Sequence, residues 1–292
     1  MLLSSFIKDG TEMLEKLYPS PEARGMVLML CKEKLGVQSY THIVEPQYQI
    51  PQDRLDEIMD DLSRMCKGEP VQYVLGCSDF CGHRFKVDRN VLIPRPETEM
   101  LVRETVDAAV GFGEKPRVLD LCTGSGCIAW SVKLEIPQAD VYAADKSIPA
   151  LSIASSQGLG PSPVFFEMDI LDTSLDFPYG RFDVIASNPP YIMESEKTLM
   201  RSNVLDYEPG LALFVPDSDP LLFYRAIAFW ADRLLVPGGC VVAEINESLS
   251  SETAALFSGS GLQKVEIIRD FFGEDRFVKA RKQGSSPSAR PL

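Results

Sequence analysis

The regular alternation of short apolar runs with helix-like stretches after Pro116 constrains the fold more than any other feature of this chain. The apolar runs are VLDLC, VYAAD, VFFEMD, FDVIAS and CVVAEI, with KVEIIRD and RFVKA near the end. Predominantly apolar runs that do not alternate with polar residues and are separated by helices are typical of a parallel sheet covered on both faces. Residues 94–282 are therefore predicted to form a doubly wound, Rossmann-like α/β domain with a mostly parallel seven-stranded sheet, closed by an antiparallel pair.

Three further segments differ from this domain in their patterns. Residues 1–68 repeat apolar side chains at helical spacing without strand-like alternation, which predicts a small all-helical domain of roughly four or five short helices. Residues 69–93 contain the β-type runs VQYVLG and HRFKV with Gly82 between them, which predicts a hairpin joining the two domains. Residues 283–292 have the composition of a disordered tail.

The segment LIPRPETEMLV follows the predicted hairpin and carries two prolines that would stiffen a loop. A helix is predicted to follow it and to run to about Val110. Glu97 or Thr98 is placed to cap this helix, because the side-chain oxygen of a capping residue accepts an N–H group of the first turn.

The charge balance argues against a nucleic-acid-binding role. The chain has 29 Lys and Arg against 42 Asp and Glu, a formal net charge of −13. Proteins that hold DNA or RNA by its phosphates normally present clustered basic residues, so a protein partner is favoured and direct nucleic-acid binding is not expected. No apolar run reaches the roughly 18 to 20 residues needed to span a bilayer, and the N-terminus lacks a signal-peptide pattern. We expect a cytoplasmic monomer without membrane contact.

The seven cysteines are scattered along the chain, which is typical of reduced thiols rather than of a disulfide framework. Cys77, Cys81 and His83 lie close enough in sequence to suggest a metal site. No second ligand pair with zinc spacing accompanies them, so the favoured interpretation is a hairpin with small buried side chains and no metal.

The sequence VLDLCTGSGCIA places a glycine-rich turn between the first predicted strand and its helix. Asp120 lies near the end of the strand, and the turn is formed by Thr123, Gly124, Ser125 and Gly126. Glycines let a backbone approach a ligand closely, and the N-terminus of the following helix offers free N–H groups. Because GSGCIA also fits the permissive G-x-G-x-x-A dinucleotide pattern, a nicotinamide-dependent dehydrogenase is an alternative.

Three carboxylates at the ends of successive predicted strands favour S-adenosylmethionine as the cofactor. Asp120, Asp145 and Asp169 belong to the first, second and third runs. Asp145 could accept the ribose hydroxyls of an adenosyl group in either class of cofactor. Asp120 and Asp169 would attract a sulfonium and an ammonium group, whereas they would repel a pyrophosphate. Ile170 could supply an apolar face to the adenine.

The run Asn188, Pro189, Pro190 and Tyr191 follows the FDVIAS strand at the sheet edge where ligands bind. An amide or aniline-like nitrogen is a weak nucleophile that carries two N–H bonds. If the Asn188 side-chain oxygen and the Pro189 carbonyl each accept one, the nitrogen is oriented and becomes more electron-rich as it attacks a methyl group. Tyr191 would stack on the planar target. The pattern predicts methyl transfer to a planar NH₂ group, with Asn188, Pro189 and Tyr191 as the catalytic residues that contact the substrate.

In combination, these motifs resemble the HemK/PrmC-type family of protein-(glutamine-N(5)) methyltransferases, which modify peptide chain release factors. The matching segments are PVQYVLG, VLIPRPETE, DLCTGSG, NPPY, YEPGLAL and RDFFGEDRFVKA, preceded by the helical domain. The resemblance implies a class I methyltransferase domain that transfers a methyl group from S-adenosylmethionine to the glutamine of the Gly-Gly-Gln loop of a release factor. The helical domain is implied to help dock that factor.

The resemblance also implies roles for individual residues. Cofactor contacts are implied at Cys122 to Gly126, Asp145, Ile170 and Asn188, and substrate contacts along Asn188 to Tyr191. Cys122 stands where many relatives have the first glycine of the turn. A cysteine is tolerable there if its backbone angle is not left-handed.

The residues leave other targets open. The same Asn-Pro-Pro-Tyr chemistry serves the exocyclic amine of a flipped adenine in DNA or RNA, although the net charge and the lack of a basic, aromatic-laced segment disfavour it. A glutamine of a ribosomal protein is a nearer alternative. A binding module that has kept the fold without activity is disfavoured by the intact Asn188 and turn glycines.

Overall fold

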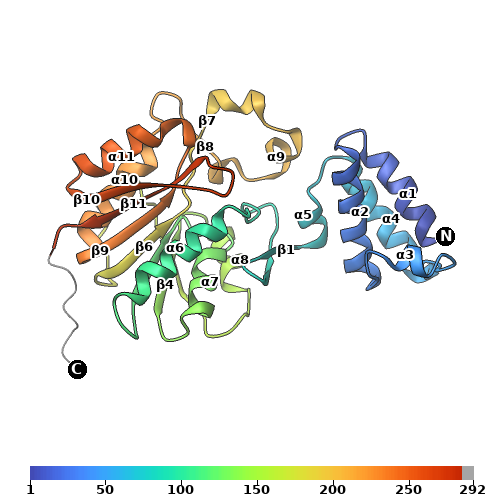
Figure 1. Ribbon diagram of the computed structural model, residues 1–292, viewed down its shortest axis with the longest axis horizontal. Coiled ribbons are helices and arrows are strands. Elements are labelled where there is room, and N and C mark those ends of the chain that lie inside the picture. Colours follow the sequence, from blue (N-terminus) through green and yellow to red (C-terminus); the bar gives the residue numbers. More distant parts are fainter. Residues whose placement is uncertain (285–292) are drawn as a thin grey trace. The chain divides into compact units, whose positions relative to one another are not determined.

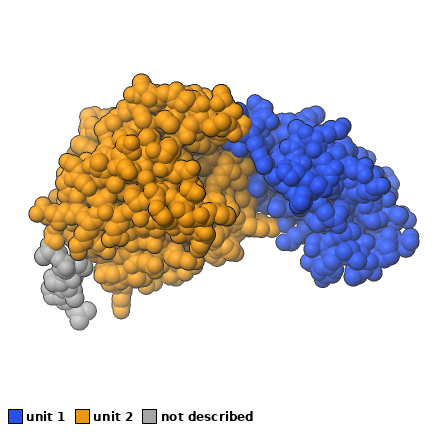
Figure 2. Space-filling model, turned by 45° about the horizontal axis from the view of Figure 1, so that its top comes forward, with its two compact units in different colours: residues 1–77, 201–207 blue, residues 78–200, 208–292 orange. Residues whose placement is uncertain are grey.

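The computed structural model describes residues 1–284, which divide into two compact units (Figure 2). Unit 1 comprises Met1–Cys77 together with Arg201–Tyr207, and unit 2 comprises Ser78–Met200 with the chain from Glu208 onward. Unit 2 is therefore interrupted once in sequence. Of the predicted tail, residues 285–292 lie outside the described range.

Unit 1 is a set of helices, most of which pack on one apolar core. The helices are α1 (Leu3–Leu14), α2 (Ser20–Leu35), α3 (Thr41–Val44), α4 (Gln52–Cys66), α5 (Val71–Leu75) and α9 (Ser202–Tyr207) (Figure 1). Phe6 of α1, Leu30 of α2 and Leu62 of α4 are among the buried side chains of this core. The predicted helical periodicity of this region therefore corresponds to helices in the structure.

Helix α9 belongs to unit 1 although the predicted division of the chain placed it with the sheet. Arg201 Nη1 lies 2.7 Å from Glu22 Oε1. The Tyr207 hydroxyl donates to the Lys67 carbonyl at 3.0 Å. These contacts join residues more than a hundred positions apart, and no local sequence pattern signals them.

The run VQYVLG, predicted as a strand, forms helix α5 instead. Val71 and Val74 are both buried in the core of unit 1, and a spacing of three residues fits one helical turn rather than the alternation of a strand. Gly76 ends the helix with a left-handed φ of 70°. Because the run is short and rich in valine and tyrosine, its composition alone favours a strand.

The hairpin lies after this helix, in β1 (Cys77–Phe80) and β2 (His83–Lys86). Its turn residues Cys81 and Gly82 have positive φ angles of 48° and 73°, as a tight two-residue hairpin turn requires. Among residues 1–284, no three His, Cys, Asp or Glu side chains are placed to hold a metal ion. Within the same range, every helix is too short or too polar to cross a membrane.

Unit 2 contains a seven-stranded sheet in the order β10, β11, β9, β6, β3, β4, β5. The strands are β3 (Arg117–Leu121), β4 (Asp140–Asp145), β5 (Val164–Glu167), β6 (Phe182–Ser187), β9 (Leu235–Glu244), β10 (Leu262–Arg269) and β11 (Asp275–Lys282). Neighbouring strands are parallel, except that β11 pairs antiparallel with both β9 and β10. The predicted doubly wound sheet with an antiparallel pair at its edge is confirmed.

Helices cover both faces of this sheet (Figure 1). They are α6 (Thr98–Val110), α7 (Cys127–Glu135), α8 (Ile148–Ser155), α10 (Leu222–Leu234) and α11 (Ser250–Gly259), and the short strands β7 (Ile192–Met193) and β8 (Phe214–Val215) pair in the connections. Leu119 and Ile185 pack in one core with α10 and α11, whereas Val118 and Val184 pack in the other with α6 and α7. The central strands are predominantly apolar because both of their faces are buried.

Candidate active site

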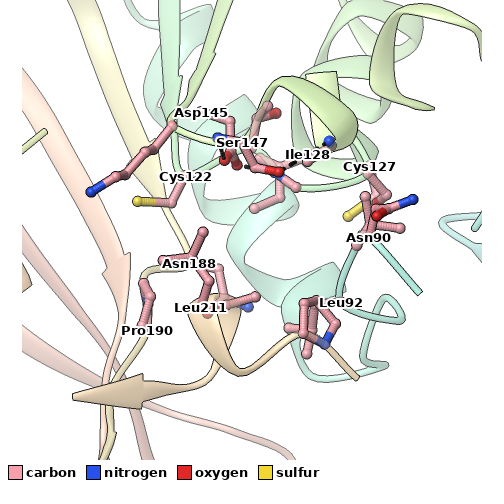
Figure 3. A pocket seen from close by; sticks show the side chains of 18 of the residues that line it. Asn90, Leu92, Cys122, Cys127, Ile128, Asp145, Ser147, Asn188, Pro190 and Leu211 are labelled. Carbon is pink, nitrogen blue, oxygen red and sulfur yellow. Dashed lines mark hydrogen bonds between the residues drawn. The ribbon is translucent and has the colours of Figure 1, made fainter. Parts of the chain in front are cut away.

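A pocket opens at the carboxyl ends of β3, β4 and β6, where ligands bind in doubly wound sheets. The predicted site residues that line it are Cys122, Thr123, Gly124, Ser125, Asp145, Asp169, Ile170, Asn188 and Pro190, whereas Asp120, Gly126, Pro189 and Tyr191 do not. Figure 3 shows Asp145 and Ser147 at one side of the pocket and Asn188 and Pro190 at another. We name these sides the turn end (residues 122–128 with 145–147) and the Asn188 end (residues 188–191).

The sharp turn after β3 is held by a main-chain hydrogen bond to β4. The Thr123 N–H donates to the Ala144 carbonyl of β4 at 2.9 Å. Cys122 has a φ of 61° and so adopts the left-handed conformation, which costs a residue with a side chain roughly 1–2 kcal/mol. The condition under which a cysteine would be tolerable here is therefore not met. The bend after the strand imposes the left-handed backbone whichever residue occupies the position.

Gly126 lets helix α7 pack closely against helix α8. Its φ is 79°, and a Cβ at this position would lie 3.0 Å from Ala154 Cβ and 3.1 Å from Trp130 Cδ1. The Trp130 Nε1–H group donates to the Ala154 carbonyl at 2.8 Å, which fixes the same contact. Gly126 therefore shapes the turn end through helix packing and does not itself line the pocket.

Asp145, the last residue of β4, is held by two main-chain N–H groups. Its Oδ2 accepts from Gly124 and its Oδ1 from Ser147, each at 2.8 Å. Burial raises the pKa of this carboxyl, and the N–H groups of Ser147 and Gly124 oppose that shift. A carboxylate has about four acceptor positions, so each oxygen can still accept a hydrogen bond from a hydroxyl group in the pocket.

The other two predicted carboxylates differ from the prediction. Asp120 is fully buried and accepts the Thr123 hydroxyl proton at 2.5 Å, so it orders the turn from beneath and does not face a ligand. Burial raises the pKa of Asp120 to about 7. Asp169 does line the pocket, but its Oδ2 lies 2.7 Å from Lys146 Nζ, which partly neutralises it. Ile170 is buried and presents an apolar side chain to the pocket.

Tyr191 supports the Asn188 end from behind the pocket wall. Its hydroxyl donates to Glu244 Oε1 at 3.0 Å, and its carbonyl accepts from Asn246 Nδ2 at 3.2 Å. The ring packs against the core on the α10 side of the sheet. The expected stacking of this ring on the target does not fit this arrangement, because the ring and hydroxyl are both used in packing and bonding within the protein.

Two loops that the chemical argument did not assign to the site also line the pocket, at residues 90–98 and 209–212. Glu208 joins them, because its carboxylate accepts from Arg95 Nη2 at 2.6 Å and from the Ile93 N–H at 3.2 Å. The Glu208 side chain is buried. In the sequence, these segments were recognised by the motifs VLIPRPETE and YEPGLAL alone.

Comparisons with known proteins agree with this geometry. Residues 5–76 match the family described as PrmC N-terminal domain, and residues 96–205 match Methyltransferase small domain. A release factor glutamine methyltransferase of Bacteroides thetaiotaomicron is 40% identical over 276 residues, covering 92% of this chain and 96% of the relative. This chain belongs to the release factor glutamine methyltransferase family. The resemblance found in the sequence is thereby confirmed.

Other comparisons extend this result. A release factor glutamine methyltransferase of Neisseria gonorrhoeae is 41% identical over 266 residues, covering 90% of this chain and 93% of the relative. A solved methyltransferase structure from Pyrococcus furiosus has a TM-score of 0.50 and 15% identity, covering 80% of this chain and 100% of that one. At this level of identity the likeness concerns the fold.

In this family member, Asn188 is supported by two residues that were not predicted to act in the site, Thr98, which lines the pocket, and Glu244, which does not. Thr98 Oγ1 donates to Glu244 Oε2 at 2.8 Å and accepts from Asn188 Nδ2 at 3.2 Å. Thr98 begins α6, yet neither it nor Glu97 caps the helix through its side chain. The predicted capping role is wrong, because the Thr98 hydroxyl bonds Glu244 instead. In the sequence, Glu244 could have been singled out because it is a charged residue within the otherwise apolar run CVVAEI.

Proposed function

We propose that this protein transfers a methyl group from S-adenosylmethionine to the side-chain amide nitrogen of the glutamine in the Gly-Gly-Gln loop of peptide chain release factors. The observation that carries the proposal is that one pocket contains both a hydroxyl-accepting carboxylate, Asp145, and the strand-end Asn188. Family relatives named for this activity match nearly the whole chain. We further propose that unit 1 helps to dock the factor.

The donor and acceptor set at the turn end fits an adenosyl cofactor. Asp145 retains two acceptor positions, which match the two ribose hydroxyls. Met168, Ile170 and Leu171 line the pocket and offer an apolar surface for a planar base. A dinucleotide would instead bring a pyrophosphate to a turn beside the Asp145 carboxylate, where like charges repel.

At the Asn188 end, the residues orient the target and do not need to deprotonate it first. When bound, the cofactor supplies an electrophilic methyl group. The Asn188 side-chain oxygen, which belongs to a pocket-lining residue, accepts one N–H bond of the glutamine amide and aligns the nitrogen lone pair for attack. The Pro189 carbonyl would accept the second N–H bond, although Pro189 is not among the pocket-lining residues in the described part of the chain. The chain has two histidines, His42 and His83, and neither lines the pocket among the described residues. The amide nitrogen becomes strongly acidic on methylation, so its proton can leave to water.

The test is incubation with methyl-labelled S-adenosylmethionine and one of four acceptors. The acceptors are a release factor, the same factor with its loop glutamine replaced by alanine, ribosomal proteins and duplex DNA. Label in the unmodified factor alone is expected. Equal label in both factors, or label in DNA or a ribosomal protein instead, would refute the proposal.

A further inference from the structure

The hydrogen bonds behind Asn188 have a defined direction. A carboxylate can only accept, whereas a threonine hydroxyl has one proton to donate and lone pairs to accept with. The Thr98 proton therefore points to Glu244 Oε2, at 2.8 Å. The lone pairs of Thr98 then remain for Asn188, and only the NH₂ group of the asparagine can bond them, at 3.2 Å.

This direction decides which atom of Asn188 can face a substrate. With Nδ2 bonded to Thr98, Oδ1 is on the opposite side of the planar amide and is available as an acceptor. A reversed amide would place Oδ1 against the Thr98 lone pairs and turn two N–H bonds towards the N–H bonds of the target. Donors would then face donors, and the target nitrogen would lose an acceptor.

The same carboxylate holds the other end of the Asn188 run. The Tyr191 hydroxyl donates a hydrogen bond to Glu244 Oε1 at 3.0 Å, so the two oxygens of Glu244 accept from two different residues, Thr98 in the pocket wall and Tyr191 behind it. Glu244 is 2% exposed and is not a pocket-lining residue among residues 1–284, so it acts through Thr98 and Tyr191 and not by contact.

We propose that Glu244 is a positioning residue that sets the direction of the hydrogen bonds through Thr98 to Asn188, so that the Asn188 oxygen and not its NH₂ group faces the target. This inference deepens the proposed function and rests on it for the identity of the target nitrogen. It assigns to Thr98 the role of relay between a buried carboxylate and the asparagine.

The proposal implies a pH dependence. Burial raises the pKa of Glu244, while Thr98, Tyr191 and the Arg276 charge lower it and Glu97 raises it. Tyr224 also interacts electrostatically with this carboxylate. When Glu244 takes up a proton it can donate to Thr98 Oγ1, and the Thr98 proton is then free to turn towards Asn188. Turnover should therefore fall as the pH decreases through the pKa of Glu244.

Three variants separate this role from simple support of the fold. Thr98→Val removes the hydroxyl at nearly constant shape and should lower kcat by about tenfold, the upper range for one hydrogen bond. Thr98→Ser keeps the hydroxyl and should restore most of the turnover. In Glu244→Gln the side chain has a single oxygen, so it can accept a hydrogen bond from only one of Thr98 and Tyr191. This variant should lower kcat by about three- to tenfold. The KM for S-adenosylmethionine should stay within about twofold in each.

Two readouts report the direction of the bonds. The first is kcat against pH at saturating substrates, in which the acid-side fall should be present in wild type and Thr98→Ser and absent in Glu244→Gln. The second needs no substrate: the Asn188 side-chain amide resonances, assigned by their loss in Asn188→Ala, should shift with pH in wild type and not in Glu244→Gln.

Turnover within twofold of wild type in Thr98→Val and Glu244→Gln, superimposable pH profiles, or amide resonances indifferent to Glu244 would each overturn the proposal. A wild-type protein that does not label the release factor would refute the proposed function instead. The amide resonances would in that case still decide the positioning role, so the two failures are distinguishable.

Discussion

The two ends of the pocket are held in place by different kinds of group. At the turn end, the main-chain N–H groups of Gly124 and Ser147 hold Asp145. At the Asn188 end, Asn188 is instead held by side chains, because it donates to Thr98 and Thr98 in turn donates to Glu244. Main-chain support survives a change of side chain if the new residue keeps the backbone angles. Side-chain support fails when one member is removed, so the two ends should respond differently to mutation.

The largest effect is expected from Asn188→Ala. The variant removes the acceptor that we propose bonds the target in the transition state, and loss of one such group typically lowers kcat by about two to three orders of magnitude. S-adenosylmethionine affinity, measured by calorimetry, should change by less than about threefold because the turn end is intact. Near-normal turnover would remove Asn188 from the mechanism.

An intermediate effect is expected from Asp145→Ala, which should weaken S-adenosylmethionine binding more than any other substitution at the turn end. It removes the two charge-assisted bonds that we propose Asp145 accepts from the ribose hydroxyls, each worth about 1.5–3 kcal/mol, although repacking and water recover part of this. The Kd for S-adenosylmethionine should rise about 10- to 100-fold, with kcat at saturation within about threefold. Asp145→Asn keeps one acceptor oxygen and should lose less affinity. A fall in kcat that exceeds the change in Kd would contradict this division between the two ends.

The smallest effect is expected from Cys122→Gly. The left-handed backbone at this position costs a side chain roughly 1–2 kcal/mol, and the extra freedom of glycine in the unfolded chain offsets about half of that. The free energy of unfolding, from chemical denaturation, should rise by up to about 1 kcal/mol, with Kd for S-adenosylmethionine nearly unchanged. Cys122→Val, with a β-branched side chain, should be less stable than wild type. A marked loss of stability in the glycine variant would show that the thiol itself supports the turn.

The same contrast explains what the sequence could predict. The alternation of strands and helices, the glycine turn and Asp145 follow from strand-length apolar runs and from residues next to one another in the chain, which local patterns describe. Thr98 and Glu244 are separated by more than a hundred residues, and only the folded chain brings their side chains together. The sequence therefore identified Asn188 as the reacting end without the residues that orient it.

Predictions that rested on a short run or a single motif position were the other source of wrong assignments. VQYVLG has the composition of a strand, and its helical state follows from the burial of Val71 and Val74 in a core that the run itself does not encode. Asp120 was assigned to the ligand because of its place in the motif, yet the strand buries it beneath the turn. In both cases tertiary packing outweighed the local pattern.

Because α9 belongs to unit 1, the helical unit cannot be completed during synthesis until residues 201–207 have been made. A ribosome that has completed residues 1–77 must add about 130 more before Arg201 and Tyr207 can reach Glu22 and Lys67, a delay on the order of 10 seconds at ordinary rates of synthesis. The helical unit is thus begun first but finished after most of the sheet has emerged. A fragment cut after Cys77 would for the same reason correspond to an assembly intermediate rather than to a whole module.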